Sequence, residues 1–134
     1  MGLDIKQKVL IAIYTEYQKD LPNIDGNVKA DILGIDNNIF NVAIEKLENE
    51  GLITASNLIK GGSSTVWNTI MVNLTHTKMT PDGISYIEEK LGIERTLTGA
   101  EKVRNVSVKV AEWGWDQFKD IAAKTLSEIL KSQF

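Results

Sequence analysis

The sequence predicts an α+β protein that is mostly helical, in which a helix-turn-helix and a β-hairpin precede a long C-terminal helical extension. Two observations lead to this prediction. Apolar residues recur at helical spacing along most of the chain, but between residues 52 and 74 they form short runs typical of strands. The turn at residues 60–65, rich in Gly and Ser, separates two of these runs at the spacing of a hairpin.

The first helix is expected from Asp4 to about Gln18, because apolar residues recur three or four positions apart in this stretch. The packing face consists of Ile5, Val9, Ala12, Ile13 and Tyr17. Turn-forming residues follow at positions 20–27, and Asn27 is expected to cap the next helix.

Two short amphipathic segments then meet at Gly34. A glycine can adopt the left-handed conformation that ends a helix, and Asp36 can cap the helix that follows. The second segment has an apolar face at helical spacing, and Gly51 is expected to end it. The face is formed by Phe40, Ala43, Ile44 and Leu47.

Two more helix starts lie beyond the hairpin. Thr80 followed by Pro81 is a helix-start signal, and Gly92 is expected to end that helix. Thr98 and Glu101 form a capping box at the start of the extension, which could run to about residue 132 with a break near Gly114. We therefore divide the chain into a domain at residues 1–97 and a helical extension at residues 98–134.

Composition excludes several functional classes. The chain contains no cysteine and only one histidine, His76, so neither a thiolate metal site nor a multi-histidine site is expected. No apolar run approaches the roughly 20 residues that span a bilayer. The carboxylates do not lie amid apolar residues, and a solvated surface is expected for them. We expect a cytoplasmic protein that is not an enzyme and uses neither cofactor nor metal.

Motifs around the two short helices carry a resemblance to a known fold. The stretch Leu33-Gly-Ile-Asp, together with residues 43–53, resembles the winged helix-turn-helix signature of bacterial regulators. Residues 79–87, beginning Met-Thr-Pro-Asp-Gly, resemble the step from the wing into the next helix. More narrowly, the arrangement over residues 4–92 is similar to YjcQ-like proteins of Gram-positive bacteria and their phages. The resemblance implies that residues 1–97 form a winged-helix domain.

The resemblance also implies a surface for double-stranded DNA, because the second helix of such a motif enters the major groove. Asn37, Asn38 and Asn41 are expected on its exposed face, where Asn can pair with an adenine edge. The alternative is that this row of Asn is a solvated surface favoured for local backbone reasons. The expected phosphate contacts are Lys29, Lys46, Lys60, Ser63 and Ser64.

Charge favours a different function for the same surface. Residues 1–51 contain five Lys and nine acidic residues, a net charge of −4, whereas DNA-binding surfaces are usually basic. Val42 and Glu45 occupy positions at which DNA-binding members usually have Arg or Lys. A protein-interaction module that uses Asn37, Ile39, Val42 and Glu45 with the C-terminal helix is therefore the alternative.

The C-terminal extension carries more apolar side chains than one spare helix needs. An exposed apolar stripe of this size has to be covered, and a homodimer seam or a partner-binding helix is the expected cover. Packing within the chain and anchoring on a membrane surface are the alternatives. The expected interface consists of Val106, Val110, Trp113, Trp115, Phe118, Ile121, Leu126 and Ile129.

Overall fold

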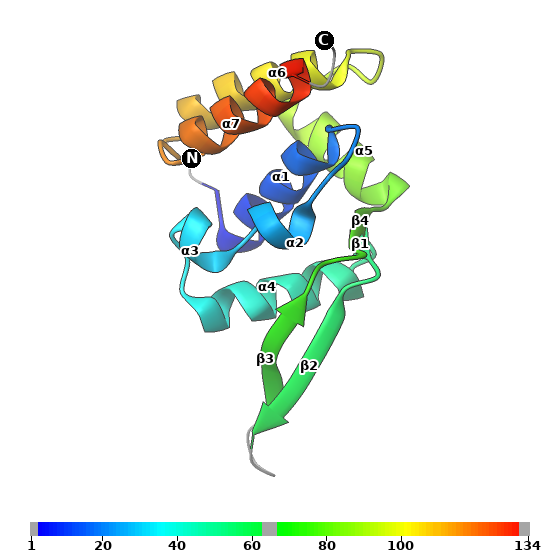
Figure 1. Ribbon diagram of the computed structural model, residues 1–134, viewed down its shortest axis with the longest axis vertical. Helices are drawn as coiled ribbons and strands as arrows, with labels where there is room; N and C mark the ends of the chain where they lie inside the picture. Colours follow the sequence, from blue (N-terminus) through cyan, green and yellow to red (C-terminus); the bar gives the residue numbers. More distant parts are fainter. Residues whose placement is uncertain (1–2, 63–66, 132–134) are drawn as a thin grey trace.

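The structure is a computed structural model of the 134-residue chain that describes residues 3–62 and 67–131. These residues form a mostly helical α+β arrangement, as the sequence predicted (Figure 1). The elements are α1 (Ile5–Tyr17), α2 (Ile24–Asn27), α3 (Ala30–Leu33), α4 (Asn37–Asn49), β1 (Ile53–Thr54), β2 (Asn57–Gly62), β3 (Trp67–Asn73), β4 (Lys78–Met79), α5 (Pro81–Leu91), α6 (Gly99–Glu112) and α7 (Phe118–Lys131).

Helix α1 is the centre of the hydrophobic core. Asp4 caps it through a capping box with Gln7, and every residue from Val9 to Glu16 is buried. A helix that is buried all round needs neighbours on both sides. In Figure 1, α4 lies on one side of α1, the α6–α7 pair lies on the other, and α5 also packs against it.

The expected turn between two short helices is present. Gly34 ends α3 in the left-handed conformation with φ of 68°, and the Asp36 carboxylate accepts hydrogen bonds from the N–H groups of Asn38 and Ile39 at 3.0 and 3.2 Å. The prediction that Asn27 caps the next helix was wrong. Asn27 instead lies at the end of the short helix α2, which forms within the turn-forming residues. Asn23 caps α2 by accepting a hydrogen bond from the Gly26 N–H.

The strands form two small antiparallel sheets. Strand β1 pairs with β4 close to the helical core, and β2 pairs with β3 in a hairpin that projects past α4 (Figure 1). The expected helix start is confirmed, since Thr80 caps α5 with Pro81 in its first turn. Gly83 lies in the same turn, where a Cβ atom would come within 2.0 Å of the Leu52 carbonyl oxygen. Only glycine therefore permits this approach of α5 to the chain before β1.

The C-terminal extension folds into two helices that lie side by side at the top of Figure 1. Thr98 and Glu101 form the predicted capping box of α6. The predicted break is also present, because Gly114 has φ of 84° between α6 and α7. None of the helices in the described part of the chain is both long enough and apolar enough to cross a membrane.

The predicted interface of this extension needs a correction. Its side chains form no exposed stripe, because they are buried or partly buried within the chain itself. The physical reason is α1, whose apolar residues face the extension as well as α4 and α5. A homodimer stays a prediction without an assigned surface, and so does the division at residue 97. The corrected residues are Val106, Val110, Trp115, Phe118 and Ile129, which are buried, and Trp113, Ile121 and Leu126, which are partly buried.

Candidate functional site

The outer face of α4 presents both polar and apolar side chains. Asn37 and Asn38 are exposed in the first turn, and Lys46 is exposed two turns later. Ile39 lies between them with 51% of its surface exposed, although it is a large apolar residue. Two of the three predicted Asn readers are therefore on the surface, beside an apolar side chain.

The third predicted reader, Asn41, is not on this surface. Its exposed fraction is 2%, so the prediction that it reads base edges from the outer face was wrong. The hairpin causes this, because β3 packs along α4 and covers the side of the helix that carries Asn41. The Asn41 Nδ2 atom is buried and has no hydrogen-bond partner among the described residues.

The hairpin is also joined to α4 by charged side chains. Lys60 of β2 forms an ion pair with Glu45 of α4, and Thr69 of β3 donates a hydrogen bond of 3.1 Å to the same carboxylate. The hydrogen bond from Lys60 holds the pKa of Glu45 below its ordinary value. Lys60 was expected to contact phosphate, but Glu45 largely neutralises its positive charge. The predicted contacts Ser63 and Ser64 lie outside the described residues.

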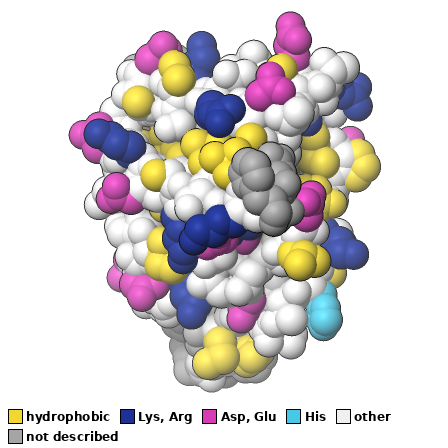
Figure 2. Space-filling model, turned by 45° about the horizontal axis from the view of Figure 1, so that its top comes forward, with side chains coloured by type: hydrophobic (Ala, Val, Ile, Leu, Met, Phe, Trp, Pro, Cys, Tyr) yellow, Lys and Arg dark blue, Asp and Glu magenta, His cyan; other side chains and the backbone are white. Residues whose placement is uncertain are grey.

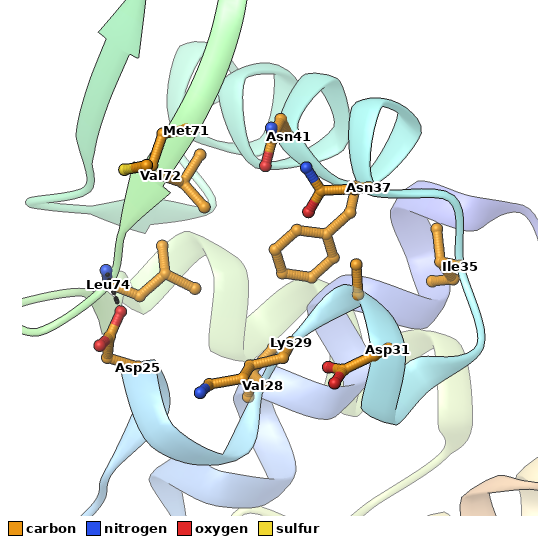
Figure 3. Close-up of a pocket in the computed structure, with 12 residues that line it drawn as sticks. Asp25, Val28, Lys29, Asp31, Ile35, Asn37, Asn41, Met71, Val72 and Leu74 are labelled. Carbon is orange, nitrogen blue, oxygen red and sulfur yellow. Dashed lines mark hydrogen bonds between the residues drawn. The ribbon is translucent and has the colours of Figure 1, made fainter.

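A groove of about 540 Å³ lies between the α2–α3 segment, the first half of α4 and strand β3 (Figure 3); we call it the α3–β3 groove. Figure 3 shows Lys29 and Asp31 on one side of the groove and the carboxamides of Asn37 and Asn41 on the other. Val72 and Leu74 contribute apolar side chains from the β3 side. The remaining lining residues are Asp25, Val28, Ala30, Ile35, Phe40 and Met71.

The charged groups of the α3–β3 groove are only partly used by the protein. The Asp25 carboxylate accepts a hydrogen bond of 2.9 Å from the Leu74 N–H, and Asp31 accepts one of 2.9 Å from the Ile32 N–H. Lys29 is exposed and makes no ion pair with any residue that the structure describes. Lys29 therefore keeps its charge available to a ligand or to a phosphate.

A second groove, of about 370 Å³, lies between the start of α1 and the outer face of α4; we call it the α1–α4 groove. Its lining is mostly apolar and includes Ile39 and Val42, with Lys46 also present. Lys6 borders it as well and forms an ion pair of 2.7 Å with Glu50, which raises the pKa of Lys6. The apolar residues at exposed positions of α4 were the sequence signal for this groove.

Two carboxylates lie buried on the opposite side of α1, contrary to the expectation of solvated acidic residues. Glu88 of α5 accepts a hydrogen bond of 2.8 Å from the Tyr14 hydroxyl and pairs with Lys102 of α6 at 2.7 Å. Burial and the hydrogen bond to Glu88 raise the pKa of Tyr14 well above its ordinary value.

The second buried carboxylate, Glu16, accepts hydrogen bonds from Asn23 and Asn27 and pairs with Lys19 at 2.9 Å. Lys19 also pairs with Glu128 of α7. Both clusters fix the C-terminal helices to the core, and neither borders the α3–β3 groove or the α1–α4 groove. The Glu88 cluster was missed because its members are far apart in the sequence. The core of the Glu16 cluster is local in sequence, and what was not foreseen there is the burial of Glu16.

Comparison with known proteins identifies a family for this architecture. The model of the family described as YjcQ protein matches residues 7–106, from α1 into α6. No significant match was found among curated proteins, and none among solved structures. The matched region contains the whole α3–β3 groove, the whole described hairpin and all of the α1–α4 groove except Ile5 and Lys6.

Proposed function

The chain belongs to the YjcQ protein family, and we propose that it is a winged-helix regulator of bacterial or phage origin that binds double-stranded DNA. The observation that carries this proposal is the exposed first turn of α4 beside a projecting hairpin (Figure 1). In winged helix-turn-helix proteins the corresponding helix enters the major groove while neighbouring elements contact the backbone. Helix α3, the turn at Gly34 and α4 supply that arrangement here.

The proposed contacts are fewer than the sequence predicted. Asn37 and Asn38 are the candidates for base edges, because a carboxamide can donate and accept hydrogen bonds at the same time. Lys29 and Lys46 are the candidates for phosphate contacts, since both are exposed. With so few cations, we expect weak binding by a single chain that depends mainly on phosphate contacts.

Fluorescence anisotropy with labelled DNA duplexes of mixed sequence tests the proposal. We expect binding at low salt and a linear fall of log affinity with log salt concentration, because phosphate contacts release counterions. Lys46→Glu should weaken binding and lower the salt slope by about one, the contribution of roughly one phosphate contact. Asn38→Ala should weaken binding only to duplexes that contain the preferred sequence.

Lys119→Glu on α7 is the matched control, because Lys119 is exposed but lies outside α4 and the hairpin. It makes the same change in net charge as Lys46→Glu. Equal losses of DNA affinity in the two variants would therefore indicate an effect of net charge rather than a binding surface on α4. Absence of binding at low salt would rule out the proposed function.

A second candidate is a protein-interaction module, favoured by the half-exposed Ile39 in the α1–α4 groove. Charge distribution agrees with it, since residues 1–51, which include α4, carry five Lys and nine acidic residues. Figure 2, in which the α6–α7 end of the molecule comes forward, shows basic and acidic side chains interspersed over that face. That end of the molecule therefore offers no second surface of one sign that would attract nucleic acid.

Cross-linking in cells distinguishes this candidate. A photoreactive amino acid at position 39 should yield a protein adduct of one defined mass, whereas the same group at the exposed position Thr54 should not. A nucleic-acid adduct at position 39 would instead favour the DNA-binding proposal. Equal protein adducts at both positions would contradict a specific docking surface.

A further inference from the structure

The buried Asn41 carboxamide in the α3–β3 groove is the starting observation. The residue is only 2% exposed, and its Nδ2 atom has no hydrogen-bond partner among the described residues. A buried amide without a partner destabilises a fold, and each such case requires an explanation. An apolar residue of similar size would pack at this position without that cost. A ligand that accepts a hydrogen bond from the amide would explain why it is present.

The surroundings of Asn41 indicate the chemistry of such a ligand. Asn37 lies one helical turn earlier on α4 and borders the same groove, so two carboxamides face the space together (Figure 3). Phe40, Val72 and Leu74 line it with apolar surface. Two carboxamides beside apolar walls match a flat ring system that has hydrogen-bond donors and acceptors on its edge.

The opposite wall carries groups that suit hydroxyl donors. Asp25 and Asp31 each use one carboxylate oxygen to accept a backbone N–H, which leaves the second oxygen without a hydrogen bond among the described residues. A carboxylate in this position can accept hydrogen bonds from the hydroxyls of a ribose, as it does in dinucleotide-binding folds. One side of the groove therefore suits a nucleobase, through carboxamides and apolar side chains, and the opposite side suits a sugar, through carboxylates.

We propose that the α3–β3 groove binds a purine nucleoside. The base donates to and accepts from Asn37 and Asn41, because Asn pairs with both the amino group and the ring nitrogen of adenine. The ribose lies toward Asp31, and Lys29 donates to a sugar oxygen. The volume of about 540 Å³ falls within the range of pockets for small organic ligands. This inference does not depend on DNA binding.

The polar groups of the groove distinguish the nucleoside from two other possible ligands, a nucleotide and a free amino acid. Two carboxylates and one ammonium group line the groove, so a phosphate placed inside it would be repelled by Asp25 and Asp31, and a nucleotide should bind there more weakly than the nucleoside. A free amino acid could pair its charges with Lys29 and Asp31. It would leave the buried Asn41 amide without a partner, which is the feature that requires explanation.

Isothermal titration calorimetry of the full chain with adenosine tests the proposal. We expect saturable binding by the wild type that is stronger than the binding of adenosine monophosphate or leucine. Asn41→Leu should weaken adenosine binding by about tenfold or more, the effect of losing a buried hydrogen bond. Its thermal midpoint should be equal to or above that of the wild type, since Leu leaves no unpaired amide.

Asn49→Leu is the matched control, because Asn49 is the exposed last residue of the same helix and should leave adenosine binding unchanged. Should Asn41→Leu fail to fold, Asp31→Asn tests the same groove at an exposed position. That variant should weaken adenosine binding and leave the binding of free adenine unchanged.

Three results would overturn the proposal. The first is the absence of adenosine binding by the wild type at millimolar concentration. The second is tighter binding of adenosine monophosphate or of leucine than of adenosine. The third is unchanged adenosine affinity in both Asn41→Leu and Asp31→Asn, which would place the nucleoside outside this groove. None of these results depends on whether the chain binds DNA.

Discussion

The two sides of α1 differ in how their charged side chains are paired. Toward α6 and α7, the buried carboxylates of Glu16 and Glu88 have charged or hydrogen-bonded partners. Toward α4 and the hairpin, Lys29 has no ion pair among the described residues and the buried Asn41 amide has no partner. The indole Nε1 of Trp115, between α6 and α7, is likewise buried without a hydrogen-bond partner among the described residues, so the difference concerns the charged groups. The ion pairs on this side, such as Lys60 with Glu45, are partly exposed.

This difference separates a structural surface from a candidate binding surface. Buried charges that are fully paired fix the relative positions of elements, and removal of one partner is costly. Polar groups left without partners lower stability and are retained most readily where a ligand completes them. The C-terminal helices thus stabilise the core, while α4, α3 and β3 present groups that remain available for binding.

The largest effect is expected when the C-terminal helices are removed. A chain that ends at Gly92 would expose the side of α1 that α6 and α7 cover, including the buried Ala12, which lies beside Ile121 and Thr125 of α7. We expect loss of the cooperative thermal transition, measured by circular dichroism, and aggregation in sizing chromatography. A sharp transition in the truncated chain would show that α1–α5 closes its own core, and the two sides of α1 would then not differ as described.

An intermediate effect is expected from the Glu88 cluster. Lys102→Met leaves the buried Glu88 carboxylate with only Tyr14 as a partner, and should lower the free energy of unfolding by about 2–3 kcal/mol. Lys109→Met is the control, because its 3.9 Å pair with Glu112 is largely exposed and should contribute less than about 0.5 kcal/mol.

Chemical denaturation of each variant provides the measurement. Glu88→Gln in the Lys102→Met background should restore part of the loss, because it removes the uncompensated charge. Equal effects of Lys102→Met and Lys109→Met would contradict a structural role for this cluster.

The smallest effect is expected at the hairpin. Lys60→Met removes the ion pair to Glu45, and because both side chains are partly exposed, the free energy of unfolding should fall by less than about 1 kcal/mol. The Glu45 carboxyl should then titrate closer to its ordinary pKa, which NMR can follow during an acid titration. An unchanged pKa of Glu45 would show that Lys60 does not hold this carboxylate in solution.

Local sequence determined most of the secondary structure, because caps and turns depend on neighbouring residues. The caps at Asp36, Thr80 and Thr98, the left-handed Gly34, the helix end at Gly92 and the break at Gly114 are all present as predicted. The sequence also contained a signal for the packing of the extension. The apolar run at residues 9–14 occupies every side of α1, and a helix of that kind needs cover on both sides.

Tertiary structure alone decided which surface each polar residue faces. Periodicity placed Asn41 on the outside of α4, yet β3 lies against that side of the helix and encloses it. Lys60 meets Glu45, and Glu88 meets Tyr14 and Lys102, through contacts between elements that are remote in the sequence. The physical reason is that helical spacing fixes which residues share a face, whereas only the packing of other elements decides whether that face meets solvent, a ligand or the core.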